Sequence, residues 1–163
     1  MPHAFETRPR ETSPRSATPI VGWQDEYSVG LPEVDEQHKM LFDIINRLWT
    51  ATVTKASSDE MMAIVNELDR YTFTHFTAEE TFMRVIEYHD FEAHRKAHQG
   101  FIERLRAERT NVLNGGHLSL DLLRFLREWL VNHILIEDKR YAAVHLKGGQ
   151  GFSLGKFFKR FWS

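Results

Sequence analysis

The 163-residue chain contains no cysteine, which excludes disulfides, thiolate zinc sites, cysteine-ligated iron–sulfur clusters and cysteine nucleophiles. It also has no apolar run of the roughly 18–20 residues that a membrane-spanning helix needs. The first 19 residues lack the apolar stretch of a secretion signal, so we expect a cytoplasmic protein. Because the net charge is −2, the sequence does not resemble a general nucleic-acid-binding protein.

Charge is distributed unevenly along the chain and suggests three parts. Residues 1–19 are rich in Pro, Ser, Thr and Arg, and we expect a disordered leader there. Residues 20–146 hold 14 basic and 21 acidic residues, a net charge of −7, and form the predicted folded domain. Residues 147–163 hold four basic residues and no acid, and we interpret them as a glycine-rich linker followed by a basic, aromatic tail.

Four segments of the central part carry apolar residues at three- and four-residue spacing, which predicts amphipathic helices. The first begins near Pro32 and the second is opened by a capping box from Ser57 to Glu60. The third spans about 90–115, and the fourth begins at Ser119 or Asp121 and ends near 145, with Ile136 or Glu137 facing inward. Short connections predict an all-α, up-down-up-down antiparallel four-helix bundle, with residues 20–30 as an extended arm.

Polar residues interrupt all four apolar stripes at positions that ordinarily hold Leu or Ile. Any single inward histidine is most often a hydrogen-bonded core residue. A set of seven is different, because buried imidazoles and carboxylates without partners would each cost several kcal/mol, roughly. A metal site removes that cost, and its predicted ligands are His38, His75, Glu79, His94, His98, His133 and Asp138.

The spacing of these residues fits shared metal ions. His94 and His98 are four residues apart, so both imidazoles lie on one helix face and can hold one ion. His133 and Asp138 are five apart, about 140° around a regular α-helix. They can share a site only if it lies between their two directions or if the helix is locally widened.

The number and type of ligands predict two transition-metal ions. Seven ligands exceed the four that a structural zinc ion takes. Nitrogen-rich ligation disfavours magnesium and calcium. Seven side chains can complete two metal sites if both carboxylates bridge, and one of the two ions then keeps an open position.

The pattern of these ligands, with SVGLPEVDEQHKML leading into the first helix, resembles the bacterial hemerythrins over about residues 20–142. The resemblance implies a non-haem di-iron centre that binds O2 reversibly, for oxygen storage, delivery or sensing. One iron would be held by His94, His98 and His133 and the other by His38 and His75, with Glu79, Asp138 and an oxo or hydroxo group as bridges. The resemblance also implies an apolar O2 pocket formed by Phe76, Trp129, Leu130 and Ile134.

An enzyme on the same scaffold remains the alternative: a peroxide or nitric-oxide reductase that uses the same iron pair. Both functions need one iron with an open position, so the ligand pattern does not separate them. Carboxylate-rich di-iron oxygenases and ferritins use a Glu-x-x-His motif on each of two helices, and the four predicted helices carry no such pair. We therefore expect a binding protein rather than an enzyme.

The tail over residues 152–163 is predicted to form a short amphipathic helix. Its apolar residues fall on one face and its basic residues, Lys156, Lys159 and Arg160, on the other. The apolar face holds Leu154, Phe157, Phe158, Phe161 and Trp162. Such a helix needs a surface on which to fold. The sequence leaves three surfaces open: its own bundle or a partner subunit, an anionic membrane at the inner face of the cell membrane, or a different protein partner.

Overall fold

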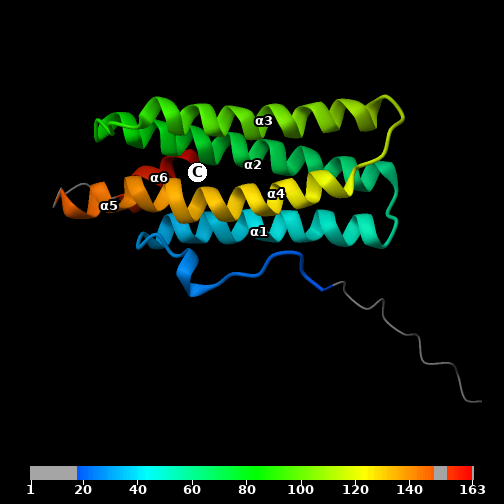
Figure 1. Ribbon diagram of the computed structural model, residues 1–163, viewed down its shortest axis with the longest axis horizontal. Coiled ribbons are helices and arrows are strands. Elements are labelled where there is room, and N and C mark those ends of the chain that lie inside the picture. The colour runs from blue at the N-terminus through cyan, green and yellow to red at the C-terminus, as the bar shows by residue number, and fades with distance from the viewer. Residues whose placement is uncertain (1–17, 149–153, 163) are drawn as a thin grey trace, which may run out of the picture.

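The structure is a computed structural model that describes residues 18–148 and 154–162. The described part is helical, with no strand, and its four long segments run up, down, up and down (Figure 1). The expected leader and linker fall mostly outside the described residues. None of the described helices combines the length and the apolar character that spanning a membrane requires.

The helix boundaries follow local signals that the sequence contains. Helix α1 covers Pro32–Val53, with the proline at its first position, where a missing backbone N–H costs nothing. Helix α2 covers Ser58–Val85, and the Ser57 hydroxyl accepts a hydrogen bond from the Glu60 amide at 3.2 Å. The predicted capping position is therefore confirmed.

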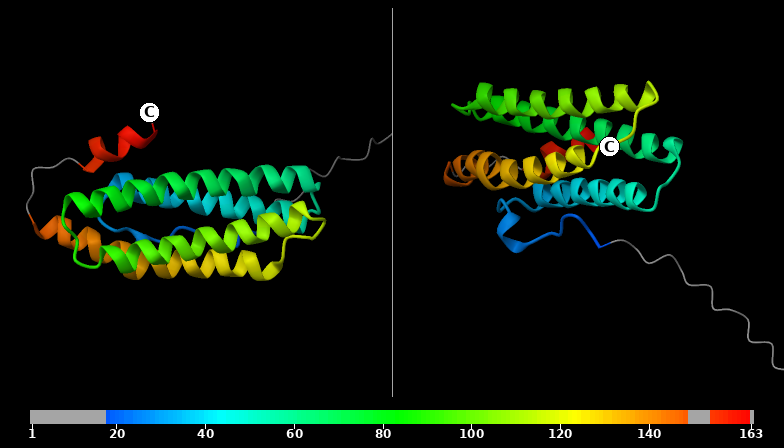
Figure 2. Two further views of the ribbon diagram at one scale, coloured as in Figure 1. Left: turned by 90° about the horizontal axis from the view of Figure 1, so that it is seen from above. Right: turned by 45° about the vertical axis from the view of Figure 1, so that its right-hand side comes forward.

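The second half of the bundle begins with α3, which covers Phe91–Leu113. The last long segment is continuous but not uniform: α4 covers Leu120–His133, a π-helical turn, η2, covers Ile134–Asp138, and α5 covers Lys139–Lys147. Neighbouring helices pack as a ring of four, α1 on α2, α2 on α3, α3 on α4 and α4 on α1 (Figure 2). The predicted four-helix bundle is confirmed.

The residues before α1 form the expected arm, which lies along the bundle and includes one short 3-10 turn, η1, at Asp25–Tyr27. Trp23 and Tyr27 pack against Phe42 of α1, with ring centroids 5.7 and 5.6 Å from it. The Asn46 side chain exchanges hydrogen bonds with the backbone of Val21 at 2.8 and 3.1 Å. These contacts fix the arm to α1, and so to the helix that carries His38.

The tail forms α6, which covers Leu154–Trp162, and it contacts α1 and α2 of its own chain. Phe157 and Phe158 are buried there, whereas Lys156, Lys159 and Arg160 are exposed. Of the surfaces that the sequence left open for the tail, the bundle of the same chain is the one that α6 contacts.

Candidate metal centre

All seven predicted ligands meet in the interior of the bundle. They come from α1, α2, α3 and the α4–η2 segment, and each is at most 5% exposed. They form two overlapping groups in which the potential ligand atoms lie within 4.8 Å of one another. One group contains Glu79, His94, His98, His133 and Asp138, and the other contains His38, His75 and Glu79.

The three histidines of the larger group point their Nε2 atoms at one spot. The His133 Nε2 lies 3.1 Å from the Nε2 atoms of both His94 and His98. Two ligands that bind one metal ion at right angles, each about 2.1 Å away, are about 3 Å apart. The observed spacing therefore fits a shared ion.

Asp138 connects the two groups through its two oxygens. Its Oδ1 lies 3.2 Å from the Nε2 atoms of both His94 and His133, and its Oδ2 lies 3.1 Å from the Nε2 of His38. Each oxygen thus faces a different set of imidazoles, as in a carboxylate that bridges two ions.

Glu79 occupies a similar position on α2. Its Oε1 lies 2.9 Å from the His75 Nε2 and 3.7 Å from the His98 Nε2, so it belongs to both groups. Among the described residues, the ion pairs of Glu79 and Asp138 are with histidines alone.

A π-helical turn places Asp138 in the cluster. Such a turn contains one residue more than an α-helical turn, so a residue five positions after His133 faces the same side of the helix. Of the two arrangements that the sequence allowed, the locally widened helix is the one present. The inward placement of Ile136 or Glu137 was wrong: Ile136 is 52% exposed and Glu137 is partly exposed, because the extra residue turns both away from the core.

The polar atoms of the cluster lack hydrogen bonds that would satisfy them. Among the described residues, both ring nitrogens of His38, both carboxylate oxygens of Glu79 and Oδ1 of Asp138 are buried without a hydrogen-bond partner. Native interiors leave few such atoms unpaired, since each costs about 1–3 kcal/mol. Buried polar atoms without hydrogen bonds, gathered among potential metal ligands, fit a metal pair that would satisfy them.

The electrostatics of the cluster also suit metal binding. Burial opposes ionisation of Asp138, but the imidazoles of His133, His38 and His94 outweigh it and hold the pKa of Asp138 well below its usual range. The pKa of Glu79 is likewise lowered, because His75 and His98 outweigh burial and the repulsion from Asp138. Burial lowers the pKa of His98 well below its usual value, which keeps that imidazole in the neutral form that binds metals.

Three further residues lie close to the ligands and were not predicted from the sequence. Gln37 on α1 lies with its Oε1 2.7 Å from the His75 Nδ1, and Glu80 lies with its Oε2 3.3 Å from the His98 Nδ1. Such partners orient a ligating imidazole and fix which nitrogen carries its proton. Tyr141 is fully buried, and burial together with the nearby Glu79 and Asp138 carboxylates raises the pKa of its phenol well above its usual value.

Sequence signals for these residues are weak. Tyr141 follows Asp138 by three residues and so shares its helix face, which is a usable signal. Gln37 and Glu80 are each adjacent to a predicted ligand, but their contacts cross from one helix to another. Only the packing of the helices shows them.

Two of the predicted O2-pocket residues stack on ligand imidazoles. Phe76 stacks on His98 with ring centroids 3.9 Å apart, and Trp129 stacks on His133 at 4.3 Å. Leu130 and Ile134 flank His133 in the sequence and are buried in the hydrophobic core. We call these four residues the apolar wall.

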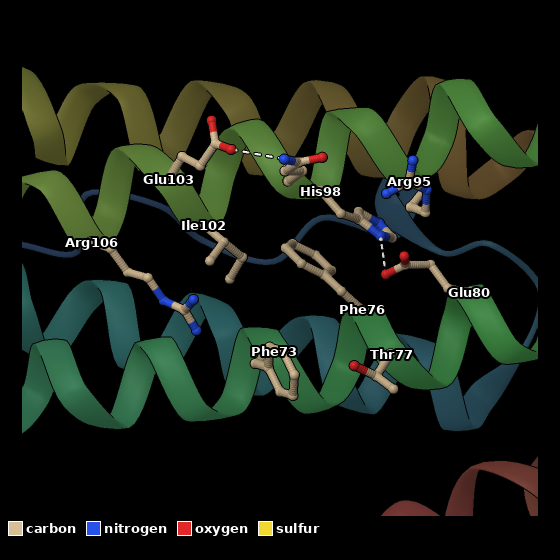
Figure 3. A pocket seen from close by; sticks show the side chains of 10 residues that line it. Phe73, Phe76, Thr77, Glu80, Arg95, His98, Ile102, Glu103 and Arg106 are labelled. Carbon is tan, nitrogen blue, oxygen red and sulfur yellow. Dashed lines mark hydrogen bonds and ion pairs between the residues drawn. The ribbon is translucent and has the colours of Figure 1, made fainter.

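A surface groove between α2 and α3 approaches the cluster from one side. Its volume is about 340 Å³, and Phe76 and Ile102 form part of its wall (Figure 3). Figure 3 shows Phe76 between the two helices, next to His98, while Glu80 reaches His98 from α2. His98 itself lines this groove beside Phe76, and both side chains are buried, with 2% and 3% of their surface exposed.

Replacing Glu80 with alanine is expected to weaken iron binding by about 10–100-fold without changing the number of ions bound at saturation. The reason is that the His98 imidazole loses the group that orients it. Competition with a chelator measures the effect. Glu103→Ala is the matched control, because Glu103 lines the same groove but pairs with Gln99 at 2.9 Å. Equal affinities for the two variants would show that Glu80 does not support His98.

The comparisons with known proteins agree with this arrangement. Residues 29–144 match the hemerythrin HHE cation binding domain. The chain is 32% identical to a bacteriohemerythrin of Stenotrophomonas maltophilia, over 88% of this chain and 98% of that protein. It is 35% identical to a bacteriohemerythrin of Pseudomonas aeruginosa, over 74% of this chain and 78% of that protein.

A comparison with solved structures also finds a hemerythrin. A crystal structure of wild-type hemerythrin superposes with a TM-score of 0.71 at 32% identity, covering 76% of this chain and 96% of that one. Proteins of this family are oxygen-binding proteins rather than enzymes. The chain therefore belongs to the hemerythrin family, and its cofactor is the non-haem iron pair of that family.

Proposed function

We propose that this protein binds O2 reversibly at its di-iron centre, for oxygen storage, delivery or sensing. When bound, the iron pair supplies the electrons that reversible O2 binding requires. The chain supplies the ligands, their orientation and the exclusion of water.

The observation that carries this proposal is the asymmetry of the ligand cluster. His94, His98 and His133 would hold one iron, and His38 and His75 would hold the other, with Glu79 and Asp138 bridging. The second iron would have one imidazole fewer, which would leave room for a small ligand. Every protein ligand is buried, so the residues around both irons would shield them from bulk water.

The apolar wall favours reversible O2 binding over a reductase activity. Phe76, Trp129, Leu130 and Ile134 offer no acid or base that could deliver protons to a bound substrate. Excluding water around the metal pair also slows irreversible oxidation.

An experiment separates binding from a reductase activity. The iron-loaded, reduced protein is exposed to O2 and then to argon, and its absorption spectrum is followed through several cycles. Reversible O2 binding predicts that the absorption spectrum of the oxygenated protein appears with O2 and disappears under argon. If the spectrum of the reduced protein does not return under argon, and the protein rapidly turns over hydrogen peroxide or nitric oxide, reversible O2 binding is contradicted and the reductase function is favoured.

Leu130→Ala is expected to leave iron content unchanged and to speed autoxidation several-fold. Leu130 is 2% exposed and lies one turn before His133, so truncation opens space for water beside the ligands. Leu123→Ala is the matched control: it removes a similarly buried side chain of α4 two turns earlier. Each variant loses about 2–5 kcal/mol of stability. If both autoxidise at the parent rate, Leu130 does not belong to the pocket.

A further inference from the structure

Helix α6 lies across α1 and α2 near the end of the bundle from which α5 extends (Figure 2). The cluster lies toward the same end, since His38 is early in α1 and Glu79 is late in α2. These two helices carry His38 and His75, the ligands of the iron that would have fewer imidazoles. The tail therefore covers the helix pair that forms that half of the proposed centre.

The contact of α6 with the bundle is aromatic. Phe158 is 1% exposed and Phe157 is 9% exposed. Their ring centroids lie 6.1 and 5.7 Å from that of Phe82, which is fully buried and three residues after Glu79 on α2. Burial of these two rings is the apolar part of the α6 contact.

Phe82 connects this contact to the ligands. Its ring lies 6.0 Å from that of Tyr141 and 5.0 Å from that of His145, and the Tyr141 ring lies 5.7 Å from the His94 imidazole. We name Phe82, Tyr141, His145, Phe157 and Phe158 the aromatic layer. It extends from the ligands to α6, and the two phenylalanines of α6 are its outer part.

Two properties bear on how firmly α6 is held on the bundle. It has nine residues, too few to be a stable helix alone in water, so it folds only while it is docked. The second property is charge: the segment 147–163 carries +4 and the segment 20–146 carries −7, so electrostatic attraction helps to hold the tail on the bundle. That attraction between exposed charges weakens as salt is added.

We propose that α6 is a detachable cover that limits the entry of water and small hydrophilic metal ligands to the di-iron centre. The proposal rests on the proposed metal centre. While α6 is docked, Phe157 and Phe158 close the α1–α2 side. When it detaches, Phe82 is uncovered and solutes approach the ligands through the aromatic layer.

The test measures the rate at which iron passes from the loaded protein to a hydrophilic chelator. Three proteins are compared: the full chain, a chain that stops at Gly149, and the F157A/F158A double variant. The last two are expected to lose iron at least tenfold faster than the first. Lys159→Ala, on the exposed face of α6, should stay within twofold of the full chain.

A second control separates uncovering from general destabilisation. Leu122→Ala removes a fully buried side chain at the opposite end of the bundle, so it lowers stability without opening the aromatic layer. Raising the ionic strength from about 0.05 M to about 0.5 M should speed iron loss from the full chain but not from the shortened one. Equal rates for the full and shortened chains, or equal acceleration by Leu122→Ala, would overturn the proposal.

Hydrogen exchange of the metal-free protein tests the cover independently of iron. Shortening the chain should speed exchange of α2 amides around Glu79 and Phe82 but not of those in α3, and unchanged α2 exchange would overturn the proposal.

A chain that takes up no iron would contradict the proposed function alone. If the full chain pellets with anionic phosphatidylglycerol vesicles, the shortened chain does not, and iron loss is equal, the tail is a membrane anchor rather than a cover.

Discussion

Replacing Glu79 with alanine is expected to abolish binding of the iron pair, so that in the presence of iron the variant is less stable than the parent by about 3–5 kcal/mol. Glu79 is fully buried, and its carboxylate lies in both ligand groups. Its removal leaves Asp138 as the one carboxylate among the described ligands, so two divalent ions would face a concentrated positive charge in a low-dielectric core. Metal analysis and thermal unfolding, with and without iron, measure both effects.

Two further variants sharpen this prediction. Glu79→Gln keeps the shape of the side chain but not its charge, and it should also lose iron. Glu80→Ala changes the next residue and should still hold two ions at saturation. The stability difference between Glu79→Ala and the parent should shrink after iron is removed, because the carboxylate then has no metal to bind. Two irons per chain in Glu79→Ala would show that the ligand assignment is wrong.

The second large effect concerns the π turn, where deleting a residue should be tolerated and inserting one should not. Deleting Ile136 leaves Asp138 four positions after His133, and in a regular α-helix that spacing keeps both on one face. Ile136 is 52% exposed, so its loss empties no core position. The deletion variant should therefore retain two irons and fold with a continuous fourth helix.

Inserting one alanine after Ile136 has the opposite effect. The carboxylate then lies six positions after His133, about 240° around an α-helix, and it no longer faces the imidazoles. This variant should lose at least one iron per chain. Metal analysis and circular dichroism of the matched pair check the prediction. Iron loss in the deletion variant, or full iron content in the insertion variant, would show that the π turn does not set the position of Asp138.

Much of the fold follows from local features of the sequence. Apolar spacing, the proline at the start of α1 and the serine before α2 identify the helices, because these signals act over a few residues. The seven ligand candidates follow from a related argument: polar residues on apolar stripes need a common partner. The structure brings all seven together.

Features that depend on contacts between helices were less predictable. Helical spacing left two arrangements open for His133 and Asp138, because the choice depends on how Asp138 reaches His38 on another helix. The misplaced Ile136 and Glu137 follow from the same unresolved turn. Amphipathicity identified the buried face of the tail but not the surface that it contacts, since periodicity carries no information about the partner.

Oxygen uptake by the iron-loaded, reduced protein distinguishes reversible O2 binding from O2 consumption. Dissolved O2 is measured as it is taken up and then as it is released under argon, alongside the iron content of the same sample. Reversible binding at the iron pair predicts one O2 bound for every two irons, with nearly all of it recovered as O2 over repeated cycles. No uptake, or O2 that is consumed and not recovered, would contradict it.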